Sequence, residues 1–194
     1  TEGNDRSSLD LPSNQNELIE NVCKLNKNTV VVLNTGSPCE MPWVDSANAI
    51  LQSWFPGQEF GNSLSDVIFG KINPSGKLPT TFPKALSDTP AYATYPGKDL
   101  QMDYEEGLFI GYRWYDREGV EPLFPFGHGL SYTTFKYSNL RAIPPKGMSS
   151  VAAFELDIEN VGDIAGKEIV QGYLRVPDSQ IGRPQKELKK FDKI

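Results

Sequence analysis

The stretch TVVVLNTGSPCEMPWVDSANAILQSWFPGQEFGNSLSDVIFG, from Thr29 to Gly70, decides the fold. It begins with Thr29 to Leu33, a continuous β-branched run that is typical of a strand buried on both faces. Ala49 to Phe55 predicts a second buried strand, and Pro56 to Gly70 has the apolar spacing of a helix that ends at a glycine. Strands and helices in such short succession indicate a parallel α/β layer.

The flanking residues extend this pattern. Residues 13–26 carry apolar side chains at helical spacing and predict a helix before the first strand. Residues 71–106 are rich in turn formers and predict surface loops around a short strand at Thr80 to Phe82. Gly107 to Asp116 is aromatic and apolar, which predicts a further strand. We therefore expect an α/β fold with a partly parallel sheet and helices on both faces.

The pattern changes near Tyr137, after which the signals are those of strands alone. Ala152 to Asn160 alternates apolar and acidic residues, as a half-buried strand does, and Glu168 to Val176 alternates in the same way. We therefore expect two domains, an α/β domain over residues 1–136 and an all-β domain over residues 137–194.

Four stretches stand out, and two of them, Asn73 to Pro83 and Pro125 to Phe135, mix turn formers with aromatic residues in an order that composition alone would not produce. The four stretches are TEGNDRSSLDLP (Thr1 to Pro12), NPSGKLPTTFP (Asn73 to Pro83), YEEGLFIGYRWYD (Tyr104 to Asp116) and PFGHGLSYTTF (Pro125 to Phe135). Together they resemble the C-terminal half of family 3 glycoside hydrolases, the β-glucosidase group, and the resemblance runs along nearly the whole chain.

This resemblance implies an α/β sandwich domain followed by a fibronectin III-like, immunoglobulin-like domain. Such a sandwich needs about seven strands, and three or four fit before Ile194, so we expect it to be truncated. In the family the nucleophile lies on an N-terminal barrel, which this sequence does not contain. The resemblance therefore implies a fragment that works with a barrel from the same polypeptide.

Glu2 is the candidate catalytic residue. Residues 2–6, EGNDR, are similar to the family motif that carries the general acid/base glutamate. A retaining glycosidase needs one carboxylate to attack the anomeric carbon and one carboxylic acid, about 5–5.5 Å away, to protonate the leaving oxygen. The resemblance implies the second role for Glu2, whereas a glutamate at this position without the motif would be read as a solvated charge.

Three neighbours of Glu2 are weaker candidates. Asp5 and Arg6 either orient the Glu2 loop or form an exposed salt bridge that contributes little stability. Asn4 occupies a place where some relatives carry an aromatic residue at the leaving-group subsite. A stacking role is lost there, and hydrogen bonding to substrate is the remaining expectation.

The other titratable residues suggest no second site. Glu105 and Glu106 point to opposite faces of an extended chain, which favours a structural role, although they come next if Glu2 is not the acid. His128 is the single histidine and is read as structural, and no Cys/His spacing indicates a metal site. Cys23 falls on a helix face and is expected as a buried thiol, while pairing with Cys39 stays open. No cofactor is expected.

The composition of the chain limits the classes of partner that we expect. The 194 residues carry a net charge of −6 and no basic block beyond a short run, so a nucleic-acid partner is not expected. No apolar run approaches the length of a membrane span. Localisation stays open between secreted and cytoplasmic.

The sequence thus predicts part of a retaining β-glucosidase that acts on terminal β-D-glucosyl residues of β-glucosides or oligosaccharides. The alternative is a non-catalytic carbohydrate-binding or scaffolding module, which an exposed aromatic platform would favour.

Overall fold

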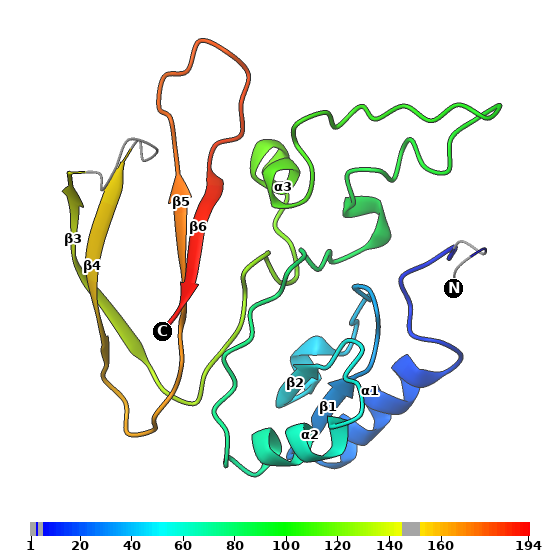
Figure 1. Cartoon of the computed structure of the whole chain (residues 1–194). Helices are drawn as coiled ribbons and strands as arrows, with labels where there is room; N and C mark the ends of the chain where they lie inside the picture. Colours follow the sequence, from blue (N-terminus) through cyan, green and yellow to red (C-terminus); the bar gives the residue numbers. More distant parts are fainter. Residues whose placement is uncertain (1–2, 4–5, 145–151) are drawn as a thin grey trace. The chain divides into compact units, whose positions relative to one another are not determined.

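The structure is a computed structural model that describes residue 3, residues 6–144 and residues 152–194. The chain divides into two compact units. One consists of residues 1–60, 78–128 and 172–190, and the other of residues 61–77, 129–171 and 191–194. The elements, labelled in Figure 1, are α1 (Gln15–Leu25), β1 (Val30–Leu33), η1 (Val44–Ser46), β2 (Ala49–Gln52), α2 (Phe60–Ile68), η2 (Leu86–Asp88), α3 (Tyr112–Glu118), β3 (Phe135–Ile143), β4 (Ala153–Asn160), β5 (Ile169–Leu174) and β6 (Glu187–Lys193).

The first unit is built on a parallel pair of strands. β1 pairs with β2 in parallel, with Val30 opposite Ala49 and Leu33 opposite Gln52. Because parallel strands need a crossover between them, the intervening chain passes through η1 before β2 begins. The α/β class is therefore confirmed.

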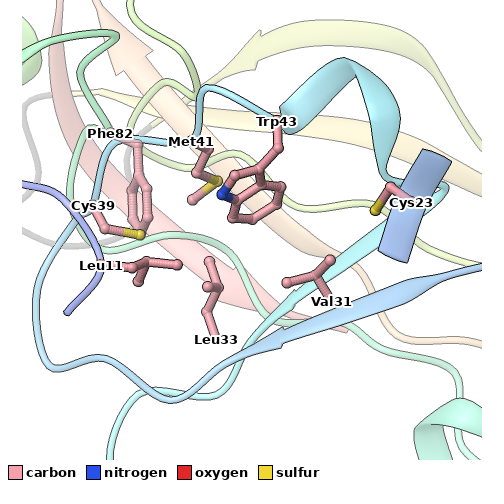
Figure 2. Packing of buried hydrophobic residues seen from close by; sticks show 8 residues of the cluster. All are labelled: Leu11, Cys23, Val31, Leu33, Cys39, Met41, Trp43 and Phe82. Atoms are coloured by element: carbon pink, nitrogen blue, oxygen red, sulfur yellow. The ribbon is translucent and has the colours of Figure 1, made fainter. Parts of the chain in front are cut away.

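The core of this unit gathers around the two strands. Figure 2 shows the Trp43 ring pointing into the cluster toward Val31 and Leu33, with Cys23 of α1 at one side. Trp43 is 1% exposed and Cys23 is fully buried, so α1 packs against the core through Cys23, with Ile19 partly buried beside it. Both cysteines are free and buried, as expected for Cys23. The buried residues of this cluster are Leu11, Cys23, Val31, Leu33, Cys39, Met41, Trp43 and Phe82.

The predicted strand over Gly107 to Asp116 is wrong, because Tyr112–Glu118 is the helix α3. Gly111 and Gly119 both have positive φ, at 55° and 67°, and they turn the chain into and out of one short helix. The aromatic run that resembles a strand places Tyr115 inward at 6% exposure, one helical turn after Tyr112.

Two further boundaries differ from prediction. The second strand ends at Gln52 rather than Phe55, because Trp54 adopts a φ of 53° that interrupts the extended backbone. The short strand expected at Thr80 to Phe82 is a single antiparallel bridge between Phe82 and Phe124.

The second unit contains an antiparallel pair. β3 pairs with β4 from Phe135 opposite Asn160 to Ile143 opposite Ala153, with a register shift between Ser138 and Arg141. The alternation over Ala152 to Asn160 is thereby confirmed as a strand. β5 and β6 form a further two-stranded sheet, whose residues are divided between the two units. The fibronectin III-like architecture and the boundary after residue 136 stay predictions.

Candidate active site

Of the four residues expected at the active site, the structure describes Arg6. Glu2, Asn4 and Asp5 lie outside the described residues. What the structure contributes is therefore the anchorage of the segment that follows them in the chain.

The Arg6 guanidinium donates hydrogen bonds to two acceptors. Its Nη1 donates to the Ser37 hydroxyl at 3.1 Å, and its Nη2 donates to the main-chain carbonyl of Asp10 at 2.7 Å. Burial raises the pKa of the Cys39 thiol to about 11, and the positive charge of Arg6 opposes that rise. Arg6 thus serves as a link between the N-terminal segment and the loop that contains Ser37.

Ser37 lies in the loop that leaves the carboxyl end of β1. Since β1 and β2 are parallel, the residues that follow Leu33 and Gln52 emerge at the same edge of the sheet. We call Thr35–Ser37 together with Gln52 the carboxyl edge. In open α/β sheets ligands bind outside the carboxyl ends of the strands, which makes this edge the expected place for a site.

Hydrogen bonds stiffen the carboxyl edge. The Gln52 side-chain amide donates to the Thr35 carbonyl at 2.9 Å and to the Thr35 hydroxyl at 3.2 Å. The Thr35 hydroxyl donates in turn to the Ser37 carbonyl at 3.0 Å. A continuous polar chain therefore runs from β2 through Thr35 and Ser37 to Arg6.

The segment after Arg6 is fixed on its other side as well. The Leu9 carbonyl accepts from the Glu40 amide at 2.9 Å, and Leu11 is 5% exposed in the core. Asn16 of α1 donates to the Asp10 carboxylate at 3.3 Å and accepts from the Trp43 indole at 2.9 Å. Residues 6–11 are therefore attached to the loop after β1, to α1 and to the core.

One exposed aromatic side chain stands beside this edge. Phe55 is 86% exposed, and its ring lies so close to Gly36 that a Cβ on Gly36 would come within 2.5 Å of Phe55 Cζ. The preceding Trp54 packs its ring edge-to-face against Phe82 at 5.9 Å. Phe55 had no distinguishing signal in the sequence, because it sits in an apolar run that predicts a buried strand.

Two other aromatic residues and the histidine have structural surroundings. Trp43 and Tyr115 are buried in the core, so neither ring belongs to a sugar-binding surface. The His128 ring stacks on Phe124 at 5.1 Å, and its carbonyl accepts from the Leu78 amide at 2.7 Å, which fits a structural role. Within the described part of the chain, no three His, Cys, Asp or Glu side chains gather as metal ligands. None of the described helices is long and apolar enough to cross a bilayer.

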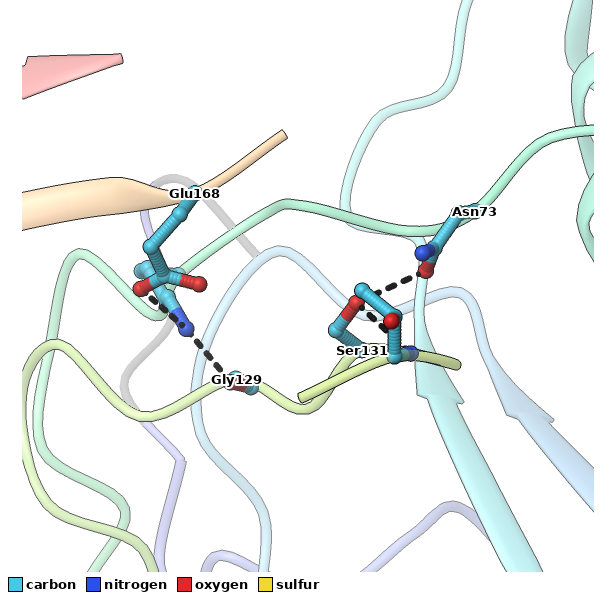
Figure 3. Close-up of polar contacts among 6 residues, drawn as sticks. Asn73, Gly129, Ser131 and Glu168 are labelled. Carbon is cyan, nitrogen blue, oxygen red and sulfur yellow. Dashed lines mark hydrogen bonds and ion pairs between the residues drawn. The ribbon is translucent and has the colours of Figure 1, made fainter. Parts of the chain in front are cut away.

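A second polar centre lies in the other unit, where two of the quoted motif stretches meet (Figure 3). Asn73 Oδ1 accepts from the Ser131 hydroxyl at 2.9 Å and from the Tyr132 amide at 2.8 Å. Lys77 donates to the Gly129 carbonyl at 2.7 Å and lies 3.3 Å from the Glu168 carboxylate. Every one of these groups is engaged by the protein itself, so this centre holds loops together.

Comparison with known proteins identifies the family. Residues 1–132 match the model of the glycosyl hydrolase family 3 C-terminal domain. The chain is 51% identical over 196 residues to thermostable beta-glucosidase B of Acetivibrio thermocellus, a match that covers all of this chain and 26% of that protein. It is 46% identical over 199 residues to beta-glucosidase BoGH3A of Bacteroides ovatus, again over all of this chain and 26% of the relative.

Solved structures agree with the sequence relatives. The chain superposes with a TM-score of 0.94 on DesR, a beta-glucosidase from Streptomyces venezuelae in complex with D-glucose, at 42% identity over all of this chain and 25% of that one. For the Bifidobacterium adolescentis beta-glucosidase the TM-score is 0.93 at 42% identity, over all of this chain and 29% of that one. The chain spans about a quarter of the length of the relatives it matches. It belongs to glycoside hydrolase family 3, whose C-terminal domain it carries.

Proposed function

We propose that this chain is part of a retaining β-glucosidase and that it supplies the general acid/base, Glu2, to an active site whose nucleophile lies on an N-terminal barrel. The substrates are β-glucosides and oligosaccharides with a terminal non-reducing β-D-glucosyl residue. Family membership and the β-glucosidase relatives support the reaction class. The motif at residues 2–6 supports the choice of Glu2.

The observation that carries the proposal is the attachment of Arg6 to Ser37 at the carboxyl edge. Arg6 follows Glu2 by four positions and belongs to the same family motif, residues 2–6. The attachment of its last residue supports a site at the edge where open α/β sheets bind ligands.

The chemistry assigns two successive tasks to one carboxyl group. In the first step protonated Glu2 donates its proton to the glycosidic oxygen while the barrel carboxylate attacks the anomeric carbon. In the second step the ionised Glu2 removes a proton from water, which attacks the glycosyl-enzyme and releases the sugar. Two carboxyl groups and water complete this cycle, so the proposal requires no cofactor.

The test compares the 194-residue chain with the complete polypeptide that contains it, using an aryl β-glucoside. We expect turnover by the complete polypeptide, with the β-anomer of the sugar as the first product in an NMR time course, and no turnover by the chain alone. Clear turnover by the chain alone that disappears with Glu2→Gln would overturn the division of roles between two domains.

A non-catalytic carbohydrate-binding module is the second candidate, and the exposed Phe55 ring is the observation that favours it. That function predicts that the chain alone binds cello-oligosaccharides, that Phe55→Ala abolishes the binding, and that the complete polypeptide hydrolyses no glucoside. Calorimetric titration of the chain with cellotetraose, together with the activity assay, separates the two functions.

A further inference from the structure

We propose that Ser37 is a positioning residue for the general acid/base, acting on the Glu2 segment through Arg6. This inference rests on the proposed function. Its basis is the hydrogen bond of 3.1 Å from Arg6 Nη1 to Ser37 Oγ, which joins positions separated by thirty-one residues.

The shape of the guanidinium makes this contact directional. Its donors are fixed in one plane, so two acceptors bound through different nitrogens fix both the position and the tilt of the group. Among the described residues Arg6 has two such acceptors, the Ser37 hydroxyl and the Asp10 carbonyl. Within that part of the chain, loss of the Ser37 acceptor would leave the hydrogen bond to Asp10, about which the side chain can turn.

Ser37 is suited to this task because hydrogen bonds to neighbouring residues fix its own position. Its carbonyl accepts from the Thr35 hydroxyl at 3.0 Å, and Thr35 is held by the Gln52 amide at the end of β2. On the neighbouring residue, the Phe55 ring covers Gly36 closely. The hydroxyl that receives Arg6 is therefore attached to the sheet and not to a free loop.

The position of the general acid matters more for proton donation to the leaving group than for the other steps of the reaction. A general acid acts within hydrogen-bond reach of the atom it protonates, and small displacements from that geometry reduce the rate steeply. A poor leaving group such as a sugar alkoxide depends on this proton, whereas dinitrophenolate departs with little help. A displaced Glu2 should therefore affect the two kinds of substrate unequally.

The experiment measures kcat/KM of the complete polypeptide on cellobiose and on 2,4-dinitrophenyl β-glucoside for Ser37→Ala, Ser37→Thr and Ser53→Ala. With Ser37→Ala we expect about a fivefold loss on cellobiose, the scale of one charge-assisted hydrogen bond weakened by exposure, and less than a twofold loss on the dinitrophenyl substrate. Ser37→Thr keeps the hydroxyl and should restore the native ratio.

Ser53→Ala is the matched control. Its hydroxyl donates to the Leu33 carbonyl at 2.8 Å, close to the same edge, without a link to Arg6. It should leave the ratio of the two kcat/KM values at the native value. A changed ratio in Ser53→Ala, or an unchanged ratio in Ser37→Ala, would overturn the inference.

Coupling to Arg6 gives an independent measurement. In an Arg6→Met background, Ser37→Ala should cause no further change in the ratio, because the pair acts as one unit. Additive losses would contradict the relay. The Glu2→Ala variant, assayed in parallel, separates the role of Ser37 from the proposed function. If Glu2→Ala shows a large leaving-group dependence and Ser37→Ala shows none, the positioning role of Ser37 alone is refuted. If Glu2→Ala shows no leaving-group dependence, the proposed function is refuted.

Discussion

The Lys77 ammonium lies 3.3 Å from the Glu168 carboxylate, and the two side chains are only 16% and 11% exposed. Lys77 belongs to the NPSGKLP stretch and also donates to the Gly129 carbonyl in the GHGLSY stretch. A largely buried ion pair is costly to break from one side, because the remaining charge keeps its desolvation penalty without a partner.

Lys77→Met should therefore lower the free energy of unfolding by about 2–3 kcal/mol, measured by urea denaturation. The double variant Lys77→Met/Glu168→Leu should recover most of that loss, since it leaves no buried charge. Lys84→Met is the control: Lys84 pairs with Glu121 at the shorter distance of 2.7 Å, but both side chains are largely exposed. Equal losses in the two single variants would contradict the role assigned to burial.

A second prediction compares two glycines, one in crowded surroundings and one in open space. A Cβ on Gly129 would overlap the carbonyl oxygen of Gly76, whereas a Cβ on Gly61 in α2 would meet open space. Gly129→Ala should destabilise by about 1–3 kcal/mol through forced backbone displacement, and Gly61→Ala should stabilise by about 0.5–1 kcal/mol. Thermal denaturation of the two variants checks both signs, and a stabilising Gly129→Ala would refute the close approach of these loops.

Part of this structure is predictable from local pattern. The β-branched run at Thr29 to Leu33 and the helical spacing around Cys23 each predict their element, because burial on a strand or one helix face leaves a regular signal. The acidic and apolar alternation before Asn160 predicts β4 for the same reason.

The remainder depends on backbone angles and long-range contacts that leave no such signal. α3 looks like a strand in sequence, since its aromatic residues favour strands and its bounds are set by the positive φ of Gly111 and Gly119. The Arg6–Ser37 contact joins two irregular segments, and neither residue differs in type from many other loop residues. The family motif points to Glu2, while the residues that hold its segment emerge only from three-dimensional contacts.

Alkaline stability should depend on Tyr115. Burial, followed by the charge of Asp88, raises the pKa of the Tyr115 hydroxyl to about 12, above the value near 10 of an unfolded tyrosine. The neutral hydroxyl thus favours the folded state, and its contribution is complete below about pH 10 and is lost as the pH rises toward 12.

Tyr115→Phe should therefore show a shallower fall in urea midpoint between pH 9 and pH 12 than the native chain. Tyr104→Phe removes a hydroxyl from a ring that is 74% exposed and should keep the native slope. The same slope in all three proteins would show that ionisation of Tyr115 is not opposed by the fold.

The measurement that tests the central claim most directly is the response of Glu2→Ala, in the complete polypeptide, to leaving group and azide. We predict that kcat/KM on cellobiose falls by about 10²–10⁴-fold, the range of general acid catalysis, while the value on 2,4-dinitrophenyl β-glucoside changes little. Azide should then accelerate turnover of the dinitrophenyl substrate and yield a β-glucosyl azide, because a small anion needs no base to attack the glycosyl-enzyme. Equal losses on both substrates with no azide product would contradict the account and pass the role to Glu105 or Glu106.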